Sequence, residues 1–288
     1  MTLTCAAVTP VRDEEANLPR LAASLIAQTV KPVAWVIVEN GSSDSTLSIA
    51  RRLAAQHPWI QVLQTPPGNR YDRSSPLKRA FHAGVSALEG KGDVVAKLDA
   101  DVSMDPDFVE GILEAFERDP RLGMASGTLF EERDGEWRES ILLGDHCWGP
   151  TRCYRRDCLA AVLPLDDGGG FATIDETKAH LAGFRTRTLR HLPFRHHRVE
   201  GSGEGNEWRA WARDGAAAHY TGYRMSYLLA RCVYRMRTEP AALALIFGYV
   251  NALARRRPRY HDRRVRAALR ERQRIRHFGA VVRRQVDV

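Results

Sequence analysis

Residues 94–101 have the sequence VVAKLDAD. The first five residues form a short, mostly apolar stretch with the length of a buried strand, and this stretch leads directly into Asp99 and Asp101. In an extended chain residues i and i+2 point to the same side, so we expect the two carboxylates to face one way. Two carboxylates this close repel each other unless a cation lies between them.

The same pattern of an apolar strand followed by a polar turn occurs twice earlier in the chain. Residues 3–8 and 35–38 are short apolar stretches, and each leads into a polar segment. Between the strands, apolar residues recur at helical spacing. We expect helices at residues 13–26, 47–53, 77–88 and 106–116, and a further strand at 60–63.

Strand and helix thus alternate four times in the first 120 residues. This alternation predicts right-handed βαβ units and a mostly parallel sheet with helices on both faces. Ligands bind such sheets at the carboxyl ends of the strands. We therefore expect the polar segments 9–14, 39–44 and 99–101 to meet at one crevice.

Residues 121–222 are less regular. Strands are expected at 123–130, 135–143 and 184–189. Asp175 and Glu176 follow a glycine-rich loop and are expected to open a helix, where acidic side chains suit the helix dipole. A carboxylate near the crevice could equally serve as a general base toward an alcohol.

Composition excludes several classes of protein. The chain has 288 residues, of which 44% are hydrophobic and 27% charged, unlike a disordered, fibrous or many-pass membrane protein. The five cysteines include no CxxC pair, which argues against a disulfide scaffold and a cysteine zinc site. The first residues lack the features of a signal peptide, so we expect a cytoplasmic protein.

Charge is divided unevenly along the chain. The net charge of +8 combines −5 over residues 1–223 with +13 over residues 224–288, which hold 17 arginines. Residues 241–250 are an apolar run too short to span a bilayer, which takes about 20 residues. We expect the 224–288 tail to lie on the inner, anionic face of the plasma membrane; the alternative is a helical hairpin packed on the catalytic domain. Nucleic acid is a weaker candidate, because no reader module is present.

The residue pairs have more than one chemical interpretation. Asp99 and Asp101 could bind Mg²⁺ or Mn²⁺ together with phosphate oxygens, or could cap a helix. Residues 39–44 could hydrogen-bond a nucleoside, or form only a turn in which Ser42, Ser43 or Asp44 caps the next helix. His197 could be a third metal ligand, or one of two exposed loop histidines.

Four stretches of the sequence resemble glycosyltransferase family 2, whose members have the GT-A nucleotide-sugar fold. They are VTPVRDEEANLPRLAASLIAQT (8–29), VIVENGSSDST (36–46), VVAKLDADVSMDPDFV (94–109) and IDETKAHLAGFRTRT (174–188). The ordered set is far more specific than any single motif. It departs from the usual family pattern in Glu39-Asn40, where two aspartates are frequent, and in residues 170–173, where Trp-Asp is frequent.

The resemblance implies a role for each matching residue. Asp99 and Asp101 would be the metal-binding pair, with Asp101 the more direct ligand, and Asp175 or Glu176 would be the base of an inverting transfer. Lys78 would stabilise the departing diphosphate. The nucleotide-sugar would be held by Thr9, Pro10, Arg12, Glu14, Glu39, Ser42, Lys78, Asp99 and Ala100.

The sequence as a whole predicts a metal-dependent glycosyltransferase. Residues 1–222 would form the GT-A domain, with a nucleotide-binding half (1–120) and an acceptor half (121–222), followed by a basic helical tail. The donor would be a UDP-sugar and the acceptor a lipid-linked or envelope glycan. A sugar-phosphate nucleotidyltransferase would need a glycine-rich, basic phosphate loop that VTPVRDEEAN lacks. A catalytically inactive membrane scaffold is disfavoured by Asp99, Asp101 and Asp175.

Overall fold

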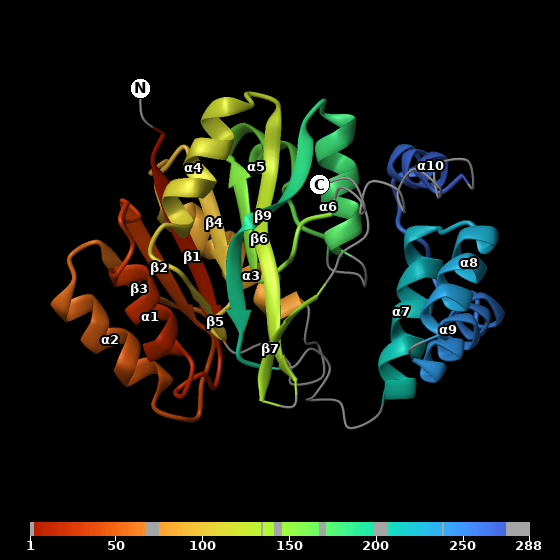
Figure 1. Ribbon diagram of the computed structural model, residues 1–288, viewed down its shortest axis with the longest axis horizontal. Helices are drawn as coiled ribbons and strands as arrows, with labels where there is room; N and C mark the ends of the chain where they lie inside the picture. Colours follow the sequence, from red (N-terminus) through yellow and green to blue (C-terminus); the bar gives the residue numbers. More distant parts are fainter. Residues whose placement is uncertain are drawn as a thin grey trace. The chain divides into compact units, whose positions relative to one another are not determined.

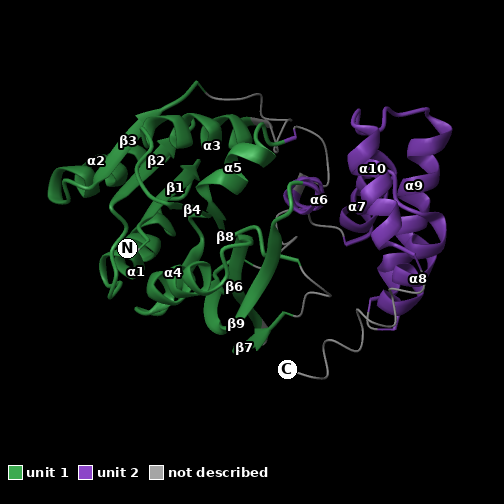
Figure 2. Ribbon diagram, turned by 90° about the horizontal axis from the view of Figure 1, so that it is seen from above, with its two compact units in different colours: residues 1–165, 182–199 green, residues 166–181, 200–288 purple. Residues whose placement is uncertain are grey.

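A computed structural model describes residues 3–66, 75–133, 135–140, 146–166, 171–198, 207–237 and 239–274. The chain forms two compact units (Figure 2). The first comprises residues 1–165 and 182–199, and the second comprises residues 166–181 and 200–288.

A nine-stranded sheet forms the centre of the first unit (Figure 1). Its strand order is β3-β2-β1-β4-β8-β6-β9-β5, with β7 paired to β6. Strands β1, β2 and β3 follow one another toward one edge of the sheet, whereas β4 lies on the other side of β1. The strand order therefore reverses at β1, and ligands bind open α/β sheets at such a switch point. The strands are β1 (Cys5–Val11), β2 (Ala34–Glu39), β3 (Ile60–Gln64), β4 (Val94–Leu98), β5 (Val102–Met104), β6 (Leu122–Arg133), β7 (Glu136–Glu139), β8 (Thr151–Arg155) and β9 (Arg185–His196).

The predicted α/β fold class is confirmed, and β1 to β4 form the predicted parallel half of the sheet. Every residue of β1, β2 and β4 is buried, as expected for strands covered on both faces. The other half is mixed, because β8 lies antiparallel between β4 and β6 while β6 and β9 are parallel.

Helices cover both faces of this sheet (Figure 2). On one face, α1 (Leu18–Ile26) and α4 (Phe108–Arg118) share a hydrophobic cluster with β1, β2 and β4. This cluster also contains Ala50 of α2 (Thr46–Gln56). The other face carries α3 (Ser75–Ala87) and α5 (Arg156–Val162). Gly84 lets α3 approach the sheet, because a Cβ there would lie 2.4 Å from Val8 Cγ1.

Several local predictions were wrong. β5, β8 and α5 were not predicted; the first two are short, so their sequences carry little periodicity. β9 extends to His196 and so includes a histidine that was expected in a loop. Helix α6 (Phe171–Leu181) begins before Asp175 and Glu176, so these acids lie inside it and do not open it.

The second unit is helical. It contains α6, α7 (Glu207–Thr221), α8 (Met225–Arg235), the short 3₁₀ helix η2 (Pro240–Leu243), α9 (Ala244–Ala254) and α10 (Arg263–Arg272). Gly215 of α7 and Gly248 of α9 let these two helices touch, because a Cβ on Gly248 would lie 1.8 Å from the carbonyl oxygen of Ala212. Helix α7 packs on α9 within the second unit. The domain bounds expected from sequence, 1–222 and 223–288, stay a prediction.

The helices of the second unit also have smaller contacts. Ile174 of α6 packs with Tyr260 and Val265, while Asp262 caps the N-terminus of α10 by accepting from the backbone of Arg264 and Val265. Across the part of the chain that is described, no helix is long and apolar enough to cross a membrane.

Candidate functional site

Hydrogen bonds join the loops that follow β1 and β2. The backbone N–H of Asp13 donates to Ser42 Oγ at 3.1 Å, and the N–H of Ser43 donates back to Asp13 Oδ1 at 2.7 Å. The N–H of Glu14 donates to Thr46 Oγ1 at 2.7 Å. The loops at the carboxyl ends of two neighbouring strands are therefore fixed to each other.

The predicted nucleoside-binding residues of these strands have different surroundings. Thr9 is buried in β1, where its Oγ1 accepts a 2.9 Å hydrogen bond from the Trp35 indole, and Pro10 lies beside Val38 in the sheet register. Glu39 is buried at the end of β2 and accepts from the N–H of Ser42. Arg12 is partly exposed, with its Nε 3.9 Å from the neighbouring Asp13 carboxylate.

The acidic pair after β4 divides between two sets of partners. Asp99 is bonded to the ammonium of Lys97, and its N–H donates to the carbonyl of Pro150. Ala100 is buried. Asp101 is only 8% exposed and lies between two cationic side chains of the β9 end, those of His196 and Arg198. The ion-pair partner of Asp99 is therefore Lys97, and those of Asp101 are His196 and Arg198.

His196 lies between two carboxylates. Its Nε2 is 3.4 Å from Asp101 Oδ1, and its Nδ1 is 3.9 Å from Glu131 Oε1 of β6. Burial alone would lower the pKa of His196, but the interactions with Asp101 and Glu131 outweigh it and raise this pKa to about 10. The imidazole is therefore cationic at neutral pH in the metal-free protein.

Arg198 connects the end of β4 to the loop after β1. Its guanidinium donates to both oxygens of Glu14 at 2.9 Å, and its Nε lies 3.6 Å from Asp101 Oδ2. Burial is the largest influence on both acids. It raises the pKa of Glu14, whereas at Asp101 the interactions with His196 and Arg198 outweigh it and lower the pKa.

The structure gives His197 different partners from those of His196. Its Nε2 lies 2.7 Å from Ser103 Oγ, and its ring packs edge-on against Trp137. Its backbone N–H donates to the carbonyl of Asp101 at 2.8 Å. The imidazole in ion-pair distance of the Asp101 carboxylate is thus that of His196, although the sequence prediction named His197.

Lys78 lies in the first turn of α3 and is only 3% exposed. Two residues before it, the carbonyl of Pro76 accepts a 3.2 Å hydrogen bond from the Asn40 amide. The start of α3 is therefore held at the end of β2, within the same unit as Asp101.

Asp175 and Glu176 belong to the second unit and are 0% and 2% exposed. The pKa of Tyr260, in the same unit, is raised to about 12 by burial first and then by nearby carboxylates that include Asp175. Asp101 and the side chains around it, those of Glu131, His196 and Arg198, belong to the first unit, and we call them the Asp101 group. The predicted base pair belongs to the second unit.

Three residues of the Asp101 group were not predicted as site residues: Glu131, His196 and Arg198. The side chains of a strand alternate between its two faces, so extending the expected strand through His196 would have separated it from His197. Glu131 and Arg198 carry no sequence signal of their own, because only the fold brings them to Asp101.

The donor set at Asp101 suits a divalent cation. A carboxylate oxygen and an imidazole nitrogen are ligands for Mn²⁺. Glu131 Oε1 lies on the Nδ1 side of the ring at 3.9 Å, which is beyond hydrogen-bond distance. No group of three His, Cys, Asp or Glu side chains placed to hold a metal occurs among the described residues. Mg²⁺ in particular is commonly held by one or two carboxylates together with substrate phosphates.

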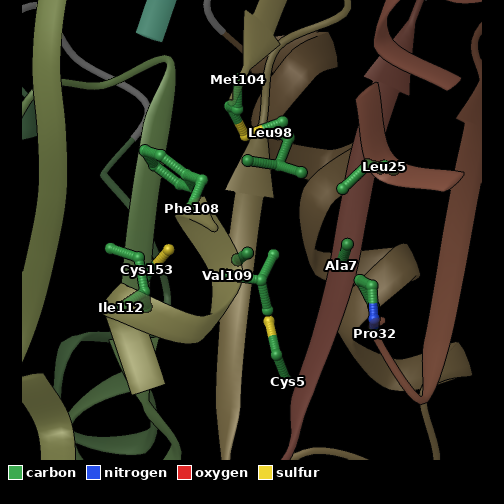
Figure 3. A pocket seen from close by; sticks show the side chains of 11 residues that line it. Cys5, Ala7, Leu25, Pro32, Leu98, Met104, Phe108, Val109, Ile112 and Cys153 are labelled. Carbon is green, nitrogen blue, oxygen red and sulfur yellow. The ribbon is translucent and has the colours of Figure 1, made fainter. Parts of the chain in front are cut away.

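A cavity in the first unit has an entirely different character. It lies between the sheet, α1 and α4, and its lining is apolar apart from the thiols of Cys5 and Cys153 (Figure 3). Burial raises the pKa of the Cys5 thiol to about 12, so this thiol is neutral and unreactive. The cavity is part of the hydrophobic core.

The chain is similar to known proteins in sequence and in fold. The family model for glycosyl transferase family 2 matches residues 6–175. The undecaprenyl-phosphate 4-deoxy-4-formamido-L-arabinose transferase of Edwardsiella ictaluri is 26% identical over 263 residues, which cover 85% of this chain and 72% of the relative.

Two solved structures share the fold at low sequence identity. A mannosyltransferase from Pyrobaculum calidifontis in complex with GDP-Man and Mn²⁺ has a TM-score of 0.57 at 14% identity, over 98% of this chain and 84% of that one. TarS from S. aureus in complex with UDP-GlcNAc has a TM-score of 0.56 at 15% identity, over 75% and 66%.

Proposed function

The chain belongs to glycosyl transferase family 2, and we propose that it transfers a sugar, with inversion, from a UDP-sugar to a hydroxyl group of a lipid-linked acceptor. The oxygen of the acceptor attacks the anomeric carbon, and the bond from that carbon to the diphosphate breaks. The proton of the acceptor hydroxyl goes to a carboxylate of the enzyme.

The observation that carries this proposal is the Asp101 group. Asp101 follows a central strand at the switch point of the sheet and has His196 at 3.4 Å. We assign Asp101 and His196 as the protein ligands of Mn²⁺ or Mg²⁺, with His196 losing the proton on Nε2 to solvent as the cation binds, and Glu131 as the residue that would orient His196. The bound cation would supply charge neutralisation for the departing diphosphate.

The remaining donor-side residues bind and position. Arg198 holds Glu14 beside Asp101, while Glu39, Ser42 and the 12–15 loop form a fixed edge for the nucleoside. Lys78 stabilises negative charge on the diphosphate. Arg12, Asp99 and Ala100 complete this binding surface. Thr9 and Pro10 act through the backbone and packing of β1, because the Thr9 hydroxyl already bonds Trp35.

We assign the general base to Asp175, with Glu176 as the alternative. Support comes from the family match, which extends to residue 175 and so includes Asp175. In this role the carboxylate accepts the proton of the acceptor hydroxyl as the new glycosidic bond forms.

The acceptor side of the proposal rests on the relative named for an undecaprenyl-phosphate transferase. A lipid-linked acceptor is confined to a membrane, so the enzyme would meet it at the membrane surface. We propose that the basic tail, residues 224–288, provides peripheral association with an anionic membrane face.

The test is release of nucleoside diphosphate from UDP-, GDP- and dTDP-sugars in Mn²⁺, with and without a lipid-linked sugar that carries free hydroxyl groups, such as N-acetylglucosaminyl-diphospho-decaprenol. We expect release from a UDP-sugar, faster with the lipid, and loss of release in His196→Ala with smaller loss in His197→Ala. A catalytically inactive chain would release nothing from any donor. Equal activity of His196→Ala and wild type would remove His196 from the metal site.

A further inference from the structure

Exposed apolar side chains are concentrated in the second unit. Of the thirteen large apolar side chains that are exposed among the described residues, eleven belong to it. They lie mainly on α8, η2 and α9, and an exposed apolar face of this kind marks an interaction surface. Single exposed apolar residues are ordinary, but a concentration in one small helical unit is not.

Helix α9 is apolar on all sides. Its sequence, ALIFGYVNALA, contains one polar residue other than its tyrosine, Asn251. One side is buried through Leu245, Gly248 and Ala252, and the contact with α7 is made there at Gly248. A helix that is hydrophobic all round is normally enclosed on every side.

The opposite side of α9 is open. Leu243, Phe247 and Val250 are 46%, 57% and 48% exposed, and their spacing of four and three residues aligns them along the helix axis. The exposed indole of Trp208 on α7 lies 6.3 Å from the Phe247 ring. We call these four residues the α9 face. Tryptophan beside aliphatic side chains is typical of the interface between a bilayer and water.

A cluster of positive charge follows this face directly. Arg255, Arg256 and Arg257 come next after α9, and all three are exposed. Within the residues that the structure describes, no acidic side chain forms an ion pair with any of them. Their charge is therefore available to an anionic partner.

We infer that the α9 face inserts into the headgroup region of an anionic bilayer, with Arg255 to Arg257 bound to the lipid headgroups. Helix α9 has eleven residues and is about 16 Å long, so it lies in the plane of the membrane and does not cross it. Alignment of an apolar face with adjoining arginines favours an anionic lipid surface over a protein partner. This inference rests on the proposed function, because the proposed lipid-linked acceptor would be met at that membrane surface.

The test uses the full-length chain and vesicles of phosphatidylcholine with or without phosphatidylglycerol. We expect co-sedimentation only with phosphatidylglycerol, and weaker at high salt. The triple change of Arg255, Arg256 and Arg257 to Gln should weaken binding about 100-fold, since each arginine contributes about a tenfold effect or less near an anionic surface. Phe247→Glu should weaken binding about tenfold or more.

Matched controls come from the first unit. Val33 is 47% exposed, so Val33→Glu introduces the same charge at a similarly exposed apolar site. Changing Lys31, Arg52 and Lys91 to Gln removes the same net charge from exposed positions. Both controls should bind vesicles as the wild type does. If Phe247→Glu fails to fold, Val250→Glu provides the same test.

Two results would overturn the inference. The first is wild-type protein that does not bind anionic vesicles, or α9 variants that bind as well as the controls. The second is sedimentation showing that Phe247→Glu dissociates an oligomer while vesicle binding persists, because the face would then belong to a second copy. Donor hydrolysis measured without vesicles tests the proposed function separately from membrane binding. The α9 variants should hydrolyse the donor as the wild type does. If the proposed function is wrong, neither the wild type nor the variants should hydrolyse it.

Discussion

The two compact units distribute polar and apolar side chains between interior and surface in opposite ways. In the first, only two large apolar side chains, Val33 and Trp137, are exposed among the described residues, while the carboxylates of Asp101 and Glu131 are buried. In the second, buried acids lie within helix α6 and large apolar side chains remain exposed on α8 and α9.

This difference indicates a division of work. Burying charge is unfavourable unless each group is paired, and the first unit pairs Asp101 with His196 and Arg198. Such an arrangement is typical of a binding site for charged ligands. Exposure of apolar surface to water is also unfavourable. A large exposed apolar surface is therefore typical of a site that binds a partner or a membrane.

The largest expected effect follows from removing Asp101. Asp101→Ala should lower transfer by about 10⁴-fold or more, because a lost metal ligand costs several kcal/mol of transition-state stabilisation. Asp107→Asn is the control, since Asp107 is exposed on the same segment. Initial-rate assays at saturating Mn²⁺ measure both. An effect confined to stability, with normal turnover per folded molecule, would count against a metal ligand.

The second prediction tests whether the helical unit takes part in chemistry at all. Asp175→Asn should lower turnover by about 10²–10⁴-fold, the usual contribution of a general base, with donor affinity unchanged. Glu176→Gln is the matched change one position later. A larger effect of Glu176→Gln would transfer the base role to Glu176. Full activity of both variants would leave these acids with only a structural role.

The third prediction concerns the residue behind the imidazole. Glu131→Gln should weaken Mn²⁺ affinity about 10–100-fold, the usual effect of losing a carboxylate that orients a ligating histidine. Glu132→Gln is its control, because Glu132 is the next residue of β6 and is exposed. Electron paramagnetic resonance of free Mn²⁺ gives the affinity. Equal affinities in both variants would separate Glu131 from the site.

The smallest effect on donor binding and transfer is expected from a substitution at the contact between α7 and α9. Gly248→Ala should destabilise the helical unit by about 1–3 kcal/mol, because the new Cβ would overlap the Ala212 carbonyl. Gly149→Ala is the control, since nothing lies within 4 Å of its Cβ position. Urea unfolding followed by circular dichroism measures stability. Loss of donor binding in Gly248→Ala would contradict the separation of roles between the units.

Sequence predicted the parallel half of the fold well and the site only in part. The strands β1, β2 and β4 have strong apolar runs, and β4 was located at its observed bounds, 94–98. The Asp101 end was predicted because it follows such a strand. Glu131, His196 and Arg198 could not be assigned, because long-range pairing of β6, β9 and β5 brings them there.

The exposed α9 face was equally beyond the sequence. An unbroken apolar run predicts a buried helix and an interfacial helix equally well. Only the packing of Gly248 against α7 identifies which side of α9 is buried and which is open. The basic residues after the run, in contrast, were visible from composition alone.

The central claim is that the Asp101 group binds the diphosphate of the donor with a divalent cation. Calorimetric titration of UDP, GDP, dTDP and CDP into the full-length protein, in Mn²⁺ and in EDTA, tests it directly. We expect UDP to bind at least about tenfold more tightly in Mn²⁺ than in EDTA, and we expect Asp101→Asn to abolish this difference while Asp107→Asn preserves it. No Mn²⁺-dependent binding of any of the four diphosphates, or an unchanged Mn²⁺ dependence in Asp101→Asn, would contradict it.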